Sequence, residues 1–234
     1  MEIRDKTIVI TGGASGIGAA MARRFAAEGA KKIVCADRDL AGAHLIETVE
    51  SDIGPIDLFV SNAGIITGGG VEVDDADWQN IWDINVLAHI RVARILVPKM
   101  LARGGGYLLN TASAAGLLAQ IGSAPYSVTK HAAVSFAEWL AITHGAEGLK
   151  VSVLCPQGVD TPMIAGVDTS TVAKDGIVTP EHVADICVEA IGDERFLILP
   201  HPVVGDYIKQ KGADPERWIS GMQRWQAMLT EQTS

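Results

Sequence analysis

A tyrosine and a lysine, Tyr126 and Lys130, stand in the sequence YSVTK directly after Pro125. Proline favours the first turn of a helix, so this spacing places the two side chains one turn apart on one helical face. An unperturbed tyrosine has a pKa of about 10, and a nearby ammonium lowers that pKa by stabilising the phenolate. Tyr126 would then pass a proton to or from a substrate oxygen. The same pair also occurs on solvated helices without any chemical role, so the hypothesis needs support from elsewhere in the chain.

A run of small residues, TGGASGIG at 11–18, follows the β-branched segment Thr7–Thr11 and precedes the helix-forming segment Ala19–Gly29. The backbone N–H groups of such a turn, together with the N-terminus of the next helix, bind a pyrophosphate, and small side chains let the phosphates approach. An ordinary tight turn can also be rich in glycine, but the position after the first strand favours phosphate binding. The candidate contacts in this turn are Gly12, Ser15, Gly16, Ile17 and Gly18.

Asp37 ends a second apolar segment, Lys32–Ala36, 19 residues after Gly18. At about this spacing an acidic side chain hydrogen-bonds the ribose hydroxyls of a dinucleotide. A carboxylate there repels a 2′-phosphate, which favours NAD over NADP as the cofactor. The neighbouring Arg38 would offset part of that repulsion, and the alternative is that Asp37 is a solvated turn residue.

The elements that position these residues alternate between short apolar strands and helices. This alternation predicts a Rossmann-like, doubly wound parallel sheet in a three-layer α/β/α arrangement, formed by one domain over residues 1–234. The expected strands are Thr7–Thr11, Lys32–Ala36, Ile56–Val60, Tyr107–Thr111, Val151–Cys155 and Phe196–Leu199. The expected helices are Ala19–Gly29, Leu40–Glu50, Trp78–Ala102, Ser127–Thr143 and Pro180–Ile191.

Composition excludes several classes of partner. A net charge of -9 disfavours nucleic acids and anionic membranes, because binding them needs a basic face, so a small molecule is the better partner. No apolar run reaches membrane-spanning length and the charged N-terminus has no signal region, so we expect a cytoplasmic protein. Cys35, Cys155 and Cys187 are expected to be reduced core residues. The six histidines show no ligand spacing, so we expect solvated or hydrogen-bonded side chains and no metal site.

Taken together, the motifs resemble those of the short-chain dehydrogenase/reductase family over roughly residues 3–200. Their order and spacing match almost end to end, and Ser113 stands thirteen residues before Tyr126, as the catalytic serine of the family does. The motifs are TGGASGIG at 11–18, SNAG at 61–64, WDIN ending at Asn85, NTAS ending at Ser113, YSVTK at 126–130 and CPQGVDTP at 155–162.

The resemblance implies a role for each matching residue. Tyr126 would be the general acid or base, Lys130 would lower its pKa and bind the nicotinamide ribose, and Ser113 would polarise the substrate oxygen. Asn85 would support a water-linked proton relay by holding the helix geometry near Lys130. Further cofactor contacts would come from Asn62, Ala63 and Gly64 on the adenosine side and from Pro156, Gly158, Val159 and Thr161 at the nicotinamide end.

The chain departs from the family pattern in two places. Ser61 replaces the first asparagine of the NNAG motif, a small polar change that we expect to be tolerated. Only 25 residues separate Asp37 from Asn62, about half the usual number, so the usual third strand at the sheet edge and its helix are expected to be absent. That loss opens the adenine pocket and predicts weaker cofactor binding than in a full-length relative. Asp52 is a possible substitute for the missing adenine-contacting aspartate, but we assign it to the loop before Gly54.

The C-terminal half of the chain is expected to form the substrate side. Residues 158–178 resemble a mobile substrate loop, and residues 200–234 a segment that closes over substrate or joins subunits. The resemblance implies a homodimer or homotetramer, and Trp218, Met222 and Trp225 form a helical stripe expected to pack on the core or a sister subunit. The candidate substrate-lining residues are Leu117, Leu118, Gln157, Met163 and Ile164. Their apolar character predicts a hydrophobic secondary alcohol or ketone.

Three functions fit this sequence. The leading hypothesis is an NAD-dependent dehydrogenase or ketone reductase that uses Tyr126. A cofactor-binding regulatory or scaffold protein that has lost turnover is favoured by the shortened adenine side and disfavoured by the intact Ser113, Tyr126 and Lys130. An epimerase or dehydratase of the same fold belongs to longer relatives, and the length of 234 residues argues against it.

Overall fold

Parallel strands form a single sheet in the computed structural model, which describes residues 1–37, 42–165, 171 and 173–233. The strand order is β2-β1-β3-β4-β5-β6 across the described residues, so the order reverses between β1 and β3. In parallel α/β sheets, ligands bind at the carboxyl ends of the strands where such a reversal opens a crevice. The strands are β1 (Thr7–Thr11), β2 (Lys32–Ala36), β3 (Leu58–Ser61), β4 (Gly106–Thr111), β5 (Leu149–Leu154) and β6 (Leu197–Ile198).

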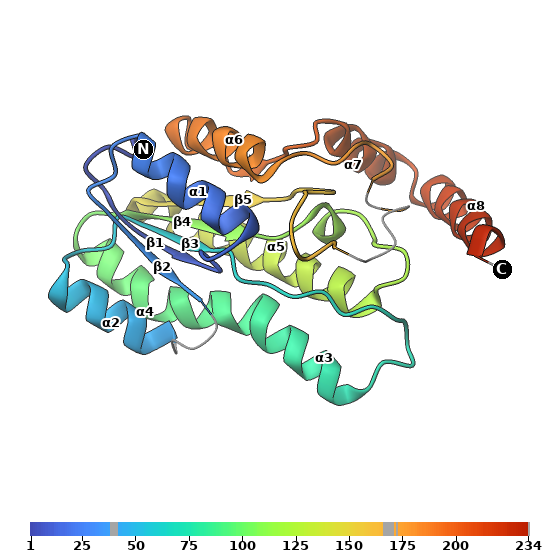
Figure 1. The fold of residues 1–234 in the computed structure, drawn as a ribbon, viewed down its shortest axis with the longest axis horizontal. Coiled ribbons are helices and arrows are strands. Elements are labelled where there is room, and N and C mark those ends of the chain that lie inside the picture. The colour runs from blue at the N-terminus through green and yellow to red at the C-terminus, as the bar shows by residue number, and fades with distance from the viewer. Residues whose placement is uncertain (38–41, 166–170, 172, 234) are drawn as a thin grey trace.

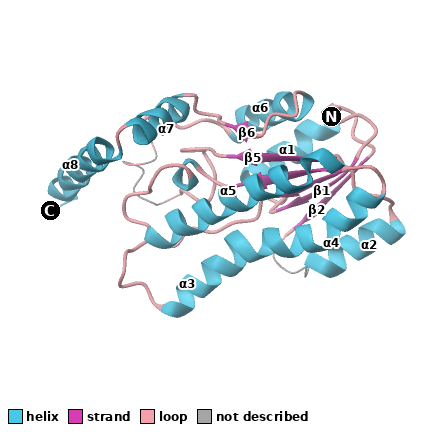
Figure 2. Cartoon of the chain, turned by 180° about the vertical axis from the view of Figure 1, so that it is seen from behind, coloured by secondary structure: helices cyan, strands magenta, loops and turns pink. Residues whose placement is uncertain are grey.

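Helices cover both faces of this sheet, as Figures 1 and 2 show. One face carries α1 (Gly16–Ala27) and α6 (Pro180–Gly192). The other face carries α2 (Gly42–Asp52), α4 (Ala88–Ala102) and α5 (Ala124–His144). The remaining helices are α3 (Asp75–Trp82), α7 (Val203–Ala213) and α8 (Pro215–Thr233). The predicted three-layer α/β/α fold is confirmed.

The two sides of the sheet bury separate cores, because successive side chains of a strand point to opposite faces. In β3, Leu58 and Val60 pack with the apolar faces of α1 and α6, whereas Phe59 packs with α4 and α5. All three side chains are fully buried. Strands buried on both faces read as continuous apolar runs, which is why the sequence pattern located them.

The edge of the sheet next to the glycine turn is formed by β2. Its only neighbour among the described strands is β1, so the expected loss of a further edge strand is confirmed. The prediction that all three cysteines belong to the core is right for Cys155 and Cys187 and wrong for Cys35, which is exposed. Cys35 is exposed because no described strand pairs with β2 on its outer side.

Some boundaries differ from the expected ones. The helix expected at Ala19 begins at Gly16, since the Ala19 amide already donates to the Ser15 carbonyl at 3.1 Å. The long helix expected from Trp78 to Ala102 is interrupted by a π-helical turn at Asp83–Leu87 between α3 and α4. Such turns occur often at functional sites, and this one carries Asn85. No helix in the described ranges is long and apolar enough to cross a membrane.

Candidate active site

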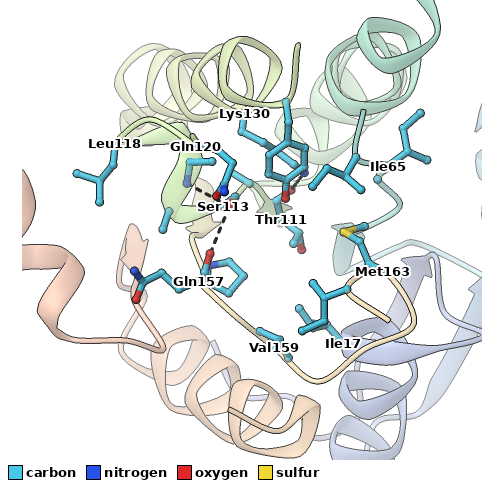
Figure 3. A pocket seen from close by; sticks show the side chains of 18 of the residues that line it. Ile17, Ile65, Thr111, Ser113, Leu118, Gln120, Lys130, Gln157, Val159 and Met163 are labelled. Atoms are coloured by element: carbon cyan, nitrogen blue, oxygen red, sulfur yellow. Dashed lines mark hydrogen bonds between the residues drawn. The ribbon is translucent and has the colours of Figure 1, made fainter. Parts of the chain in front are cut away.

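A large cavity opens at the carboxyl ends of the strands, where the strand order reverses. It has a volume of about 1760 Å³ and is bordered by Gly12 after β1, Asp37 after β2, Asn62 after β3 and Ser113 after β4. Figure 3 shows Ser113, Thr111 and Lys130 on one side of this space and Ile17 and Val159 on the opposite side. Sites for one drug-sized ligand usually occupy about 300–1,000 Å³. The cavity therefore has room for a dinucleotide and a second molecule.

The glycine turn is held in place by the segment that follows β3. The Asn62 side-chain amide donates to the carbonyls of Thr11 and Gly12 at 3.1 and 3.4 Å, and the Thr11 hydroxyl accepts from the backbone amides of Asn62 and Ala63. Gly18 packs so closely on this turn that an added Cβ would lie 2.1 Å from the Gly12 carbonyl oxygen. The small residues therefore serve the turn's own packing as well as the approach of a ligand.

The N-terminus of α1 faces the cavity and is well suited to hold a pyrophosphate. Ser15, the residue that caps α1, forms no side-chain hydrogen bond to the helix, so it leaves the first backbone N–H groups to another acceptor. Gly16 has φ of 50°, a conformation that favours glycine, and an added Cβ there would lie 3.0 Å from the Thr161 side chain. Backbone donors and the helix dipole together favour an anion at this point. The residues present fit a dinucleotide.

Asp37 follows β2 and lies next to the glycine turn. It lines the cavity, and its carboxylate accepts a hydrogen bond of 3.3 Å from the Ala14 amide. Its neighbour Arg38, expected to offset the negative charge, lies outside the described residues. Asp52 is exposed and does not line the cavity, and its carboxylate accepts from the Ser51 hydroxyl at 2.6 Å. It is the last residue of α2, so its assignment to the loop before Gly54 is wrong.

Tyr126, Lys130 and Ser113 meet at one wall of the cavity. Tyr126 and Lys130 lie in the first turns of α5, which begins with Pro125 near its N-terminus, as predicted. The Lys130 amine lies 5.5 Å from the centre of the Tyr126 ring and donates to the Thr111 carbonyl at 3.1 Å. The Ser113 hydroxyl, at the end of β4, donates to the Pro156 carbonyl at 3.3 Å. The predicted trio is therefore gathered at the sheet's carboxyl edge.

The electrostatics of this trio differ from the simple expectation. Burial raises the pKa of Tyr126 above its usual value, and hydrogen bonding with Ser113 offsets only part of that rise. Burial also lowers the pKa of Lys130 to about 8. The expectation of a lowered tyrosine pKa is thus wrong for the chain alone, because desolvation of Tyr126 outweighs the hydrogen bond with Ser113.

Asn85 lies behind this wall and does not line the cavity. Its side-chain oxygen accepts from the Ile65 amide at 3.0 Å, and its side-chain amide donates to the Ile65 carbonyl at 2.9 Å and to the Thr129 hydroxyl at 3.3 Å. It joins the segment after β3 to α5. An added Cβ on Gly64 would lie 3.3 Å from both the Asn85 oxygen and the Lys130 amine, so these two polar groups border the same narrow space.

His89, one turn after Asn85, differs from the expectation that the histidine side chains are solvated or hydrogen-bonded. It is buried, and neither ring nitrogen has a hydrogen-bond partner among the described residues; the same holds for the Nδ2 atom of Asn110 nearby. Burial, with a smaller contribution from the charge of Lys130, lowers the pKa of His89 to about 3. In the described part of the chain, no cluster of three or more His, Cys, Asp or Glu residues could hold a metal ion.

Most of the residues proposed from the sequence line the cavity. The cofactor and substrate candidates that do so are Gly12, Ser15, Gly16, Ile17, Asp37, Asn62, Ala63, Gly64, Tyr126, Lys130, Pro156, Val159, Thr161, Leu118, Gln157, Met163 and Ile164. Gly18, Gly158 and Leu117 do not line it. Gly18 packs behind the turn, the Gly158 carbonyl accepts from Val178 at 3.1 Å, and the Leu117 carbonyl accepts from the Lys211 amine at 2.8 Å. Their positions support the cavity wall from outside.

The substrate loop is joined to the wall by contacts that the sequence did not predict. Thr171 accepts from the Gln120 side chain at 2.7 Å, and Asp175 accepts from Gln157 and from the Tyr207 hydroxyl, each at 3.0 Å. Part of the predicted loop, 166–170 and 172, lies outside the described residues. No spacing rule pairs residues so far apart in sequence, so these contacts had no sequence signal.

The C-terminal stripe of Trp218, Met222 and Trp225 also lines the cavity. Trp218 packs on Tyr207 of α7, with ring centres 5.9 Å apart. The expectation that this stripe packs on the core or a sister subunit rather than facing a ligand site is therefore incomplete: α8 projects beyond the sheet (Figure 1), and its inner face borders the cavity.

Comparisons with known proteins agree with this geometry. A family model described as short chain dehydrogenase matches residues 6–50 and 41–171. The chain belongs to the short-chain dehydrogenase/reductase family. A family member from Burkholderia phymatum, solved in complex with NAD, is 27% identical and has a TM-score of 0.82, with 92% of this chain and 96% of that chain covered. Membership of this family establishes the Rossmann-like fold and the oxidoreductase class.

Two named relatives of this short-chain dehydrogenase/reductase are oxidoreductases. A 1-deoxy-11-beta-hydroxypentalenate dehydrogenase of Streptomyces exfoliatus is 34% identical, with 94% of this chain and 92% of the relative covered. A ketoacyl reductase of Nostoc sp. is 30% identical, with 84% and 79% covered. The alignment with the Streptomyces protein extends over 253 residues, more than the 234 of this chain, so that relative carries residues that this chain lacks. The family model likewise matches in two segments, and these overlap at residues 41–50, between β2 and β3.

Proposed function

We propose that this short-chain dehydrogenase/reductase moves a hydride between the nicotinamide of NAD and a secondary alcohol or ketone, with Tyr126 as the general acid or base. The observation that carries the proposal is the convergence of Ser113, Tyr126 and Lys130 on the cavity that begins at the glycine turn. One end of the cavity offers hydrogen-bond donors for an anion, and a wall beyond it carries a proton donor beside a hydroxyl. That combination fits a dinucleotide and a carbonyl substrate held in one space.

Each polar side chain has a distinct task in this reaction. When bound, the nicotinamide supplies or accepts the hydride. In the reductive direction, the Tyr126 hydroxyl gives its proton to the substrate oxygen, while the Ser113 hydroxyl turns from the Pro156 carbonyl to donate a hydrogen bond to the same oxygen. The Lys130 ammonium, held by the Thr111 carbonyl, stabilises the phenolate that forms. Oxidation runs these proton steps in reverse.

The preference for NAD rests on Asp37. Its carboxylate lies at the end of β2 on the cavity wall, where a ribose 2′-hydroxyl can donate to it and a 2′-phosphate would be repelled. The related structure with bound NAD supports the same choice.

The proposed substrate is a small molecule with a hydrophobic body. Leu118, Met163 and Ile164 are apolar residues that line the cavity. We also propose that the protein is a homodimer or homotetramer. Trp139 and Ile142 support this, since they are large apolar side chains exposed on the outer face of α5.

The test measures NADH or NADPH absorbance with a panel of secondary alcohols and ketones. Turnover with NAD that falls by roughly 10²-fold or more in Tyr126→Phe supports the proposal, because general acid–base catalysis contributes at least that much. Tyr107→Phe is the matched control: it removes another buried tyrosine hydroxyl, bonded to Ser152 at 2.7 Å, away from the cavity. Folded protein that binds NADH but turns over nothing would favour the alternative, a cofactor-binding regulatory or scaffold protein.

A further inference from the structure

The end of the cavity farthest from the glycine turn is built by α8, α7 and the segment before α6. Figures 1 and 2 show α8 extending away from the sheet next to α7. Its cavity-facing residues are Arg217, Trp218, Gly221, Met222, Arg224 and Trp225. Arg217 and Arg224 are two helical turns apart, so both lie on this inner face. The face thus combines large apolar side chains with two guanidinium groups.

A third cation, Lys174, lies against the same wall. Its amine is 4.8 Å from the centre of the Trp225 ring and 5.5 Å from the centre of the Tyr207 ring, so two aromatic faces hold it at the cavity. Trp218 in turn packs on Tyr207. Lys174 is thereby brought to the helix face that carries Arg217 and Arg224, although it is distant from them in sequence.

None of these three cations forms an ion pair with a carboxylate in the ranges that the structure describes. Elsewhere in the described ranges, Arg23 is paired with Glu181 and Arg24 with Asp185, whereas the exposed Arg4 and Arg94 form no ion pair. What distinguishes Lys174, Arg217 and Arg224 is that they gather on one cavity wall, in a chain whose net charge is -9. Unpaired cations at a cavity favour an anionic ligand.

Two carboxylates also border this end of the cavity, and both have hydrogen-bond donors of their own. Asp175 accepts from Gln157 and Tyr207. Asp214 accepts from the backbone amide of Arg217 at 2.9 Å, at the start of α8. Both carboxylates therefore have local roles in holding the wall together, and the three cations still exceed them in number.

We propose that the substrate carries a carboxylate, separated by an apolar body from the carbon that exchanges the hydride. The reacting oxygen would lie at Ser113 and Tyr126, the apolar body along Met163, Trp218 and Met222, and the carboxylate at Arg217, Arg224 and Lys174. A planar carboxylate matches the fork of a guanidinium, which binds it through two parallel hydrogen bonds. This inference deepens the proposed oxidoreductase function and rests on it.

The first experiment compares matched substrates. A series of secondary hydroxy acids, with increasing numbers of methylenes between hydroxyl and carboxylate, is assayed against the corresponding hydroxy amides, which have the same size and no charge. We expect kcat/KM to favour the acid by roughly tenfold or more at the best length, the effect of one charge-assisted hydrogen bond. Equal kcat/KM for acid and amide at every length would overturn the inference.

The variants Lys174→Gln, Arg217→Gln and Arg224→Gln locate the effect. We expect each to raise KM for the acid by a much larger factor than KM for the amide, because only the acid loses a charge-assisted hydrogen bond. Lys209→Gln is the matched control, because Lys209 is an exposed cation of α7 that pairs with Asp206 and does not line the cavity. An acid preference that survives all three substitutions would also overturn the inference.

A binding measurement separates this inference from the proposed function. Calorimetric titration of the NAD-saturated protein uses the same acids and amides without the hydroxyl group. Tighter binding of the acids than of the amides, lost in Arg217→Gln, supports the carboxylate site. If no alcohol is oxidised in that case, only the proposed activity fails. Oxidation of alcohols together with equal binding of acids and amides leaves the proposed activity in place and overturns the carboxylate site. Absence of both turnover and binding overturns both.

Discussion

The Lys130 amine lies between the Tyr126 ring, 5.5 Å away, and the Thr111 carbonyl, to which it donates at 3.1 Å. The last residue of β4 thus holds the lysine of α5 beside the tyrosine of the preceding helical turn. Burial makes this position costly for the ammonium and lowers its pKa to about 8. The reaction that we propose needs the same ammonium to stabilise a phenolate, so pH should control the rate through Lys130.

For ketone reduction, we predict that kcat/KM is constant at neutral pH and falls as pH rises above about 8. The sign follows from the protonation states: reduction needs both the Tyr126 hydroxyl and the Lys130 ammonium, and the tyrosine pKa is raised, so the lysine loses its proton first. Lys130→Met should lose this alkaline limb together with most of the rate. The initial rate of NADH oxidation against pH checks the prediction, and an unchanged limb in Lys130→Met would contradict it.

Cofactor choice should depend on Asp37. Asp37→Asn removes the charge that repels a 2′-phosphate, so the ratio of kcat/KM for NADP to that for NAD should rise by roughly tenfold, equivalent to about 1.4 kcal/mol. Asp52→Asn is the control, since it removes a carboxylate that does not line the cavity. Initial rates with both cofactors check this, and an equal change in the two variants would show that the net charge of the chain, not the site, sets the preference.

Cofactor affinity should be weaker than that of a family member with a full-length segment between β2 and β3. The described sheet ends at β2 on the adenosine side, so an adenine ring has fewer neighbours there to exclude water. Calorimetric titration with NADH measures this directly. Submicromolar binding would contradict the prediction.

Gly116 should be required for the position of Lys130. It ends a 3-10 helical turn at Ala114–Gly116, and an added Cβ would lie 2.4 Å from the Lys130 carbonyl oxygen. Gly116→Ala should destabilise the protein by about 1–3 kcal/mol and lower kcat, because α5 must move away with both Tyr126 and Lys130.

Gly192→Ala is the matched control for this substitution. Gly192 ends α6 and has nothing within 4 Å of an added Cβ, so alanine there should leave stability unchanged or improve it. Urea unfolding together with NADH-linked rates measures both effects. Full activity and full stability in Gly116→Ala would show that the contact is relieved without moving α5.

His89 should make the protein sensitive to acid. Its pKa is lowered from 6.5 to about 3, so below pH 6.5 the unfolded chain binds a proton that the folded chain does not. The contribution of the neutral His89 to the free energy of unfolding is therefore fully present above pH 6.5, and it is lost as pH decreases toward 3. Urea unfolding at several pH values should show a smaller loss in His89→Met than in the wild type. His182→Gln, which removes an exposed histidine, should behave like the wild type.

The sequence by itself determined the fold and the residues of the cavity wall formed by Ser113, Tyr126 and Lys130. Buried parallel strands have continuous apolar segments, so β1 and β2 were predicted with their observed bounds. The spacing of Tyr126 and Lys130 follows the helical repeat, and the glycine turn is recognised by its place directly after β1. Both features are local, so the sequence alone can reveal them. The short distance in sequence between Asp37 and Asn62 likewise showed that an edge strand was missing.

Only the tertiary structure decided the burial of single groups and the far end of the cavity. The exposure of Cys35 depends on whether another strand covers β2, and the pKa values of Tyr126 and Lys130 depend on how far packing removes them from water. The wall of Lys174, Arg217 and Arg224 arises where α8 meets the loop before α6. Such contacts join residues with no fixed spacing, because chain folding rather than a local repeat brings them together.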